Sequence, residues 1–379
     1  MNLRPRMLHA TTVVAILVTA VAFAAAESVA AQGAPGPVER DQIDAVLGDG
    51  FAGGQLLVWT EDAGSGSRIL AKRIFSNGLP IGGESGGAWP LTGRAGGGAV
   101  PGDQRWPALG NGIVVWSEKL DGATDYDIYA QRIAANGRSY GKPKLIVERP
   151  GNQSHPSFVV GGSELLLVWS EDSDDAGDIW GLRVSASALT PRGSAFAISK
   201  TPSAATEPIV VPDPTEGQSY LVMWTDDRAG NLDIFGTRIV PTGLPRGGST
   251  GGEFAIVDTP ENDSSATAII SRDTLSGGRD DSSRSLVMWV HEDPTDGPDV
   301  MARRLRANGY AFGNEILVAG GPGVQTAPAV SVGNDDDWFV IWSGSNVAPG
   351  AAAGSLDVYQ VDMRFNGHLR APLRRLAAD

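Results

Sequence analysis

The clearest pattern in this chain is a short run of apolar residues that ends in tryptophan and recurs six times. The run at residues 220–224 (YLVMW) shows no alternation of polar and apolar side chains, and a polar loop follows it. Such a run is typical of a β-strand that is buried on both faces. We expect the tryptophans that end these runs to lie in the core: Trp59, Trp116, Trp169, Trp224, Trp289 and Trp342.

A second β-rich segment follows each loop and carries its own spacing signal. In the fourth copy Asp233 is followed five residues later by Arg238, and Gly243 stands five residues further on. Asn-Gly pairs occur at this turn in several copies, as at Asn136 and Asn366. A type I′ hairpin turn favours this pair because both of its central residues have positive φ. Each copy is therefore predicted to be a β-hairpin.

Successive tryptophans lie about 50 to 65 residues apart, which fits a four-stranded unit and exceeds the period of leucine-rich or helical repeats. First strands are predicted before each tryptophan run, as at 156–161, and fourth strands after each turn, as at 144–148. Radially packed blades bury both faces of their middle strands. The sequence therefore predicts an all-β fold, a six-bladed β-propeller over residues 41–379 with four antiparallel strands per blade. The ring would close by side-chain packing or, alternatively, by residues 38–47 joining the last blade.

The block at 224–235, WTDDRAGNLDIF, resembles the repeat of TolB-type propellers, S-D-R-x-G-x-x-D-I-Y. It is even more similar to a repeat of uncharacterised secreted bacterial propellers, V-W-x-D-x-R-x-G-x-x-D-I-Y-G-x-R. The resemblance covers nearly all of the mature chain and implies the propeller fold. It implies little about function, because the matching residues are those that build the blade.

The N-terminal residues 1–31 have the order of a secretory signal peptide. Arg4 and Arg6 precede an apolar stretch at 11–26, and small residues follow at 29–31. An uncleaved membrane anchor is the alternative, which the short apolar length disfavours. Residues 32–40 are expected to be a flexible lead-in. The chain has no cysteine, which excludes disulfides, thiolate metal sites and a lipoprotein anchor. We expect a monomer that is secreted or periplasmic in a bacterium.

The formal net charge of −14 argues against nucleic acid as a partner, since phosphate recognition needs basic residues. Acidic residues far outnumber basic ones in the loops that follow the tryptophan runs. In a propeller these loops share one rim. We therefore expect an acidic rim that meets a basic protein surface, a cation or a component of the cell envelope.

Two sets of acidic residues raise the question of chemistry. One acid follows each of five tryptophan runs, and a group repeated in every blade is expected to stabilise a turn by accepting loop amide protons. These acids are Glu61, Glu118, Glu171, Asp226 and Glu292. The second set could bind Ca²⁺, which prefers clustered oxygen ligands, although Ala176 stands where a ligand belongs and solvated acidic loops are the simpler expectation. This set is Asp172, Asp174, Asp175 and Asp178.

The starts of the first strands differ from blade to blade. A frame Q-x-x-P occurs at 104–107, 153–156 and 325–328, with a variant at 205–208. In a propeller these positions line the mouth of the channel. Inside the frame stand Arg105, Trp106, His155 and Glu207. Convergent polar and aromatic groups that do not repeat are typical of a binding pocket; ordinary loop residues are the alternative.

The sequence thus favours a non-catalytic binding or scaffold protein that works through its acidic rim and channel mouth. The alternative is a carbohydrate-active propeller hydrolase or lyase that uses His155, Glu207 and an acid such as Glu118 or Glu171. Glycosidases need two carboxylates flanking one bond. No G-x-S-x-G, H-E-x-x-H or phosphate-loop motif is present in the sequence.

Overall fold

The computed structural model describes residues 41–51, 54–62, 66–74, 88–92, 102–173, 177–212, 219–240, 244–245, 252–269, 285–306, 310–332, 337–345, 357–364 and 366–377. The segments 1–31, predicted as a signal peptide, and 32–40, predicted as a lead-in, lie outside the described residues.

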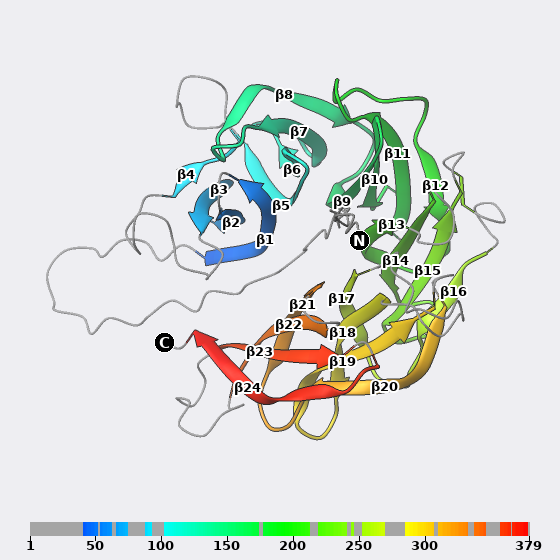
Figure 1. The fold of residues 1–379 in the computed structure, drawn as a ribbon. Helices are drawn as coiled ribbons and strands as arrows, with labels where there is room; N and C mark the ends of the chain where they lie inside the picture. Colours follow the sequence, from blue (N-terminus) through cyan, green and yellow to red (C-terminus); the bar gives the residue numbers. More distant parts are fainter. Residues whose placement is uncertain are drawn as a thin grey trace, which may run out of the picture.

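The described residues form six four-stranded antiparallel sheets, in which the strands follow one another in chain order (Figure 1). The first strands of the sheets are β1 (Asp41–Phe51), β5 (Asp103–Gly110), β9 (Gln153–Gly161), β13 (Ala205–Pro212), β17 (Asp263–Ile269) and β21 (Gln325–Val332). The second strands are β2 (Gly54–Asp62), β6 (Ile113–Lys119), β10 (Glu164–Glu171), β14 (Tyr220–Asp226), β18 (Ser285–Asp293) and β22 (Asp337–Gly344). The third strands are β3 (Ser67–Ile74), β7 (Asp127–Ile133), β11 (Asp178–Ser185), β15 (Asp233–Ile239), β19 (Gly297–Leu305) and β23 (Asp357–Arg364). The fourth strands are β4 (Trp89–Pro90), β8 (Ser139–Val147), β12 (Phe196–Ser199), β16 (Phe254–Val257), β20 (Ala311–Ala319) and β24 (Leu369–Ala377).

The strands predicted from the tryptophan repeat are confirmed. Each apolar run is a second strand that pairs on one side with a first strand and on the other with a third strand. The third strand begins at the repeat aspartate in the second, third, fourth and sixth sheets. Strand β1 pairs with β2, so residues 41–51 belong to the first sheet. The alternative in which this region adds a strand to the last blade is therefore wrong.

The sheets stand side by side in chain order. Each first strand contacts the next, from β1 through β5, β9, β13 and β17 to β21. Figure 1 shows these strands toward the middle of the molecule and the fourth strands at its periphery. This is the arrangement of a β-propeller. In the described part of the chain no helical segment has the length and hydropathy of a membrane span.

The core lies between consecutive sheets. Each cluster of buried apolar side chains joins residues of two neighbouring sheets; one contains Leu56 of β2 together with Trp116 of β6, and another contains Val168 of β10 together with Trp224 of β14. All six repeat tryptophans are buried, with Trp59 the most exposed at 6 %. Truncation of such a side chain to alanine typically costs about 3 to 5 kcal/mol.

The predicted type I′ turns are wrong at both Asn-Gly pairs of the repeat that the structure describes. Gly137 and Gly367 have positive φ (81° and 88°), but Asn136 and Asn366 do not. The amide of Gly137 donates to the carbonyl of Ala134, three residues earlier. The turn is thus a tight turn closed by a left-handed glycine, a common three-residue hairpin loop. The asparagine accepts the amide of residue i+2 through its side chain, as Asn136 does from Arg138 at 3.0 Å.

Candidate ligand-binding site

Every first strand carries a β-bulge at the same place. The pairing of β5 with β6 breaks between Arg105 and Ala108, and the other first strands break at the corresponding positions. In four consecutive sheets one bulge residue has positive φ. We call these residues the bulge set: Trp106 (50°), His155 (50°), Glu207 (52°) and Ser265 (52°).

The left-handed backbone conformation of the bulge set is energetically unfavourable for the residue types that adopt it. A left-handed conformation costs an L-residue about 1 to 2 kcal/mol, and glycine or asparagine carries it best. The chain instead places an aromatic ring, an imidazole, a carboxylate and a hydroxyl at these positions. Bulges often re-aim side chains beside active sites, and strained residues gather at functional sites. Sequence reasoning found the first three residues but missed Ser265, because its bulge lacks both the Gln and the Pro of the frame.

Trp106 and His155 meet across neighbouring sheets. Their ring centroids lie 4.5 Å apart with an interplanar angle of 34°. Trp106 also contacts the ring of Tyr126, with ring centroids 5.4 Å apart. The first-strand ends of the second and third sheets therefore share one aromatic cluster.

Arg105 and Tyr126 are held at the edge of this cluster by one carboxylate. Arg105 Nε donates to Asp103 at 3.3 Å, and the Tyr126 hydroxyl donates to Asp103 Oδ2. Burial, together with the hydrogen bond to Asp103 and its negative charge, raises the pKa of Tyr126 to about 12. Tyr126 is therefore a protonated donor at any physiological pH. Asp103 also accepts the amide of Ser67 at 3.0 Å, which ties the cluster to the first sheet.

His155 is an uncharged group in this cluster. Burial lowers the pKa of its imidazole to about 4. The Nδ1 atom is buried and has no hydrogen-bond partner among the residues that the structure describes. A buried polar atom without a partner costs about 1 to 3 kcal/mol.

Glu207 continues the bulge set on the next sheet. Its Oε2 accepts the backbone amide of Ser265 at 3.3 Å, so two bulge residues of neighbouring sheets are joined directly. Within the described ranges no hydrogen bond joins His155 to Glu207. The His–carboxylate contact on which the enzyme hypothesis depended is thus not part of this structure.

The repeated acids bind the tryptophan indoles. Trp116 Nε1 donates to Glu118 at 3.0 Å, Trp169 Nε1 to Glu171 at 3.4 Å, and Trp224 Nε1 to Asp226 at 3.0 Å. All three acids are buried. The tryptophan and the acid stand two residues apart on one strand and hence on one face of it. Their role is structural. Asp226 also accepts the loop amide of Arg228 at 2.9 Å, as expected from the sequence, and the indole is a partner that the sequence reasoning did not foresee.

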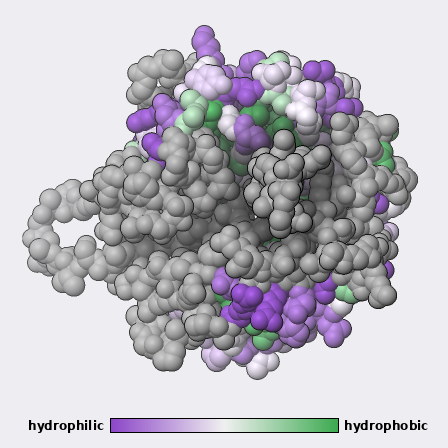
Figure 2. All heavy atoms as spheres, viewed as in Figure 1, coloured by the Kyte–Doolittle hydropathy of each residue, from purple (hydrophilic) through white to green (hydrophobic). Residues whose placement is uncertain are grey.

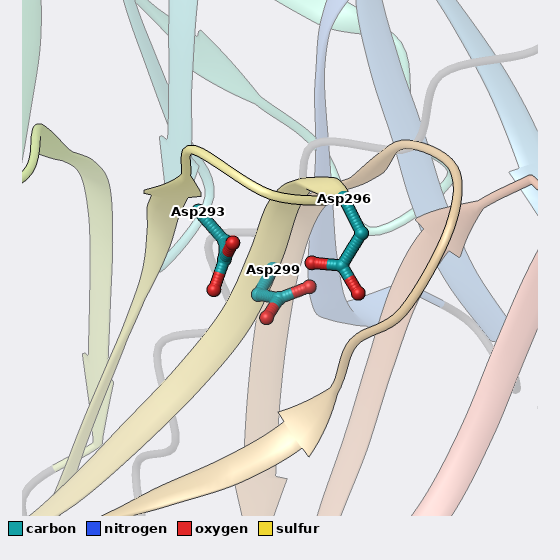
Figure 3. A group of neighbouring side chains, drawn as sticks. All are labelled: Asp293, Asp296 and Asp299. Carbon is teal, nitrogen blue, oxygen red and sulfur yellow. The ribbon is translucent and has the colours of Figure 1, made fainter.

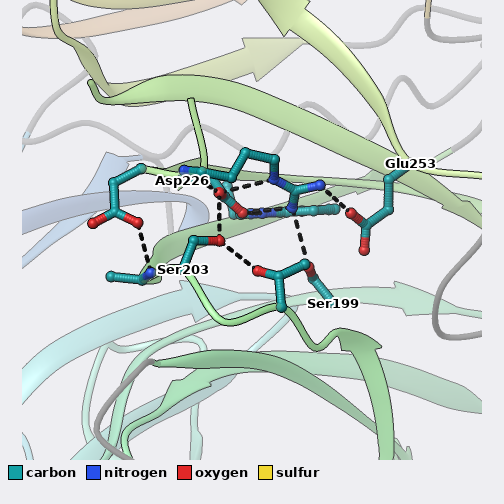
Figure 4. Close-up of polar contacts among 9 residues, drawn as sticks. Ser199, Ser203, Asp226 and Glu253 are labelled. Atoms are coloured by element: carbon teal, nitrogen blue, oxygen red, sulfur yellow. Dashed lines mark hydrogen bonds and ion pairs between the residues drawn. The ribbon is translucent and has the colours of Figure 1, made fainter. Parts of the chain in front are cut away.

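Arginines complete these contacts. Arg228 donates to Asp226 through Nε at 2.9 Å and Nη2 at 2.6 Å, and through Nη1 to Glu253 at 2.6 Å (Figure 4). Burial acts to raise the pKa of Asp226, but hydrogen bonds from Arg228 and Trp224 outweigh it and lower the pKa. Glu171 is paired in the same way with Arg149 at 2.5 Å. Neither Asp226 nor Glu171 is presented to a ligand.

In the fifth sheet the acid that binds the indole is not on the tryptophan's own strand. His291, rather than the expected Glu292, stands two residues after Trp289, and Asp263 of β17 lies opposite it. Asp263 Oδ1 accepts from Trp289 Nε1 at 2.8 Å and lies 2.7 Å from His291 Nδ1. The indole thus keeps a carboxylate partner, which comes from the neighbouring strand.

The expected acidic rim is partly internal. Glu61, Glu118, Glu171, Asp178, Asp226, Asp233 and Asp299 are all buried. They are buried because strand pairing places them inside the sheet ends. Exposed acids such as Asp121, Asp172 and Asp227 remain, and the face seen in Figure 2 is mostly hydrophilic where its residues are described.

The proposed calcium ligands are only partly within the described residues. Asp172 accepts from the Asn152 backbone at 2.5 Å and side chain at 2.8 Å, and Asp178 lies 3.3 Å from Lys200 Nζ. Asp174 and Asp175 lie outside the described residues.

A different acidic group stands in the equivalent loop of the fifth sheet. Carboxylate oxygens of Asp293, Asp296 and Asp299 lie within 4.8 Å of one another (Figure 3). This spacing is compatible with one oxygen-coordinated cation. Asp293 accepts the amide of Thr295 at 2.7 Å, and Asp299 that of Gly321 at 3.3 Å. Its sequence signal is the spacing of three between the acids.

No family model and no curated protein matches this chain. Among solved structures, hydrazine synthase of Kuenenia stuttgartiensis is similar at 13% identity and a TM-score of 0.46, over 83% of this chain and 42% of that chain. The match thus spans less than half of the hydrazine synthase chain. An endo-arabinanase of Bacillus licheniformis is similar at 13% identity and a TM-score of 0.37, over 70% of this chain and 98% of that chain. An α-L-arabinofuranosidase of Lactobacillus brevis is similar at 11% identity and a TM-score of 0.39, over 73% and 95%.

Proposed function

We propose that this chain is a secreted, six-bladed β-propeller with TolB-like repeats that binds carbohydrate at the bulge set. The observation that supports this is the convergence of Trp106 and His155 from neighbouring sheets, with Glu207 at the same position of the next sheet. The six sheets would close into a ring by packing between the first and the last.

Carbohydrate fits the chemistry of these side chains. A sugar ring has an apolar C–H face and an edge of hydroxyl groups. An aromatic side chain covers the former, and a small number of placed polar groups bind the latter. Trp106 offers the aromatic surface, while His155 and Glu207 offer hydrogen-bonding atoms.

The geometry favours binding over cleavage. A glycosidase needs an acid and a second carboxylate about 5 to 9.5 Å apart. Glu118 and Glu171, the two acids that the enzyme hypothesis offered as examples of its second carboxylate, are buried against Trp116 and Trp169. Of the acids in that hypothesis, Glu207 is the one that belongs to the bulge set.

Glycan-array and calorimetric binding with the mature chain tests this proposal. Trp106→Ala should weaken carbohydrate binding at least about tenfold, equivalent to about 1.4 kcal/mol. Trp180→Ala is the matched control, because Trp180 is a partly exposed tryptophan of the third sheet whose ring contacts Arg149 instead. Equal loss in both variants, or no carbohydrate binding at all, would contradict the proposal. Release of shorter sugars from a bound glycan would show that the chain is a hydrolase.

A further inference from the structure

We infer that Asn111 is a site of spontaneous covalent modification, at which the folded chain converts to aspartate and isoaspartate. The structure protects the Asn-Gly pairs of the repeat from the same reaction. Asn111 is followed by Gly112 in the turn between β5 and β6, away from the turn between third and fourth strands where the repeat places its Asn-Gly pairs. Neither residue belongs to the bulge set, so the modification is independent of the proposed function.

Deamidation of an Asn-Gly pair is an attack of the chain on its own side chain. The backbone nitrogen of the glycine forms a bond to Cγ of the asparagine and the bond from Cγ to Nδ2 breaks. Ammonia leaves with the amide proton, and a succinimide ring remains. Water then opens the ring at either carbonyl, which gives aspartate or isoaspartate. Glycine permits the approach because it has no Cβ. The reaction is therefore fastest where the asparagine side chain and the glycine amide are both free to move.

The turn at Asn111 leaves both reacting groups free. Asn111 and Gly112 have positive φ (50° and 68°), and Gly110 pairs with Ile113 across them, so this is a two-residue type I′ turn. Asn111 is exposed. Among the described residues, neither its side chain nor the peptide group that joins it to Gly112 makes a hydrogen bond. Attack at this turn thus breaks no hydrogen bond of the reacting groups.

The repeat pairs within the described ranges hold both reacting groups. The amide of Gly137 donates to the carbonyl of Ala134 at 2.8 Å, and Oδ1 of Asn136 accepts the amide of Arg138 at 3.0 Å. The turn at Asn366 has the same two bonds, at 2.7 and 3.1 Å. These asparagines are exposed as well, so exposure does not distinguish them from Asn111. Since each hydrogen bond is worth a factor of about five in rate, loss of two before the attack slows it at least about tenfold.

Peptide mapping by mass spectrometry of the aged mature chain tests this inference. The folded chain is incubated at mildly alkaline pH, and the mass gain at each asparagine is followed with time. We expect modification at Asn111 at least about tenfold faster than at Asn136 or Asn366. Asn111→Asp supplies the chromatographic standard that separates the aspartate product from isoaspartate.

The same chain kept unfolded in guanidinium chloride is the matched control. The three rates should become similar there, because glycine follows each asparagine. Asn136 and Asn366 also report on the folded sample, since transient global unfolding would modify all three sites together. Modification at Asn111 no faster than at the repeat pairs would overturn the inference. A difference between the sites that persists in guanidinium chloride would overturn it too, because its cause would then lie in the local sequence rather than in the turns.

Discussion

At the scale of single residues, the repeat is held together by an indole and a carboxylate two positions apart. The acid and the tryptophan share a face of the second strand, and the pair is buried at the end of the sheet. The pairing is recoverable from sequence spacing, because residues i and i+2 of a strand point the same way. The exchange in the fifth sheet is not, because Asp263 precedes Trp289 by 26 residues and only strand register brings them together.

Asp226→Asn tests the structural role of the repeated acid. The change removes the charge that binds Arg228 and Trp224 in a fully buried position, and we expect a loss of about 2 to 4 kcal/mol in the free energy of unfolding. Asp121→Asn, at an exposed loop position, should change it by less than about 0.5 kcal/mol. Chemical denaturation of both variants measures the difference. A nearly neutral Asp226→Asn would assign that acid to something other than stability.

At the scale of elements, the strands were predictable and their irregularities were not. The apolar runs and the Asp–Arg spacing recur in phase along the chain, so the order of the strands could be predicted from them. The bulges depend on register between two strands, which a single strand does not encode. Pro107, Pro156 and Pro208 were a partial signal, since a residue before proline avoids the right-handed helical region. The site could thus be located at Trp106, His155 and Glu207, but not its strain or Ser265.

The strain of the bulge set is testable with a pair of neighbouring serines. Ser265 has φ of 52°, so Ser265→Gly should stabilise the protein by about 1 kcal/mol. Ser264 lies next to it on the same strand without positive φ, and Ser264→Gly should destabilise by about 0.5 to 1 kcal/mol because glycine loses more backbone entropy. Thermal and chemical denaturation report both signs. The same sign in both variants would mean that the left-handed position is not strained.

At the scale of the whole molecule, buried titratable groups make stability depend on pH in opposing ways. Burial, with help from Glu148 and Asp125, raises the pKa of Asp127 to about 6, and burial also raises the pKa of Asp233 and Asp299. Between pH 3.8 and about 6 folded Asp127 keeps a proton that the unfolded chain has lost, so its contribution is lost as the pH rises through this window. Asp226, with its lowered pKa, contributes stability above the ordinary value of 3.8 that is lost as the pH falls further.

The lowered pKa of His155 makes stability depend on pH in the opposite direction to the carboxyl groups whose pKa is raised. Its pKa is lowered from 6.5 to about 4, so its contribution is lost as the pH falls through that window. Three carboxyl groups with raised pKa values favour the folded state at lower pH, against one imidazole that favours it at higher pH. The net charge of −14 adds self-repulsion at neutral pH. We therefore expect maximal stability between about pH 4 and 6 rather than at neutrality. Thermal denaturation of the mature chain from pH 3 to 8 measures it. Asp127→Asn should flatten the decline above pH 4, while His155→Phe should steepen it. A maximum at pH 7 or above that neither variant moves would show that these groups do not control the stability of the folded chain.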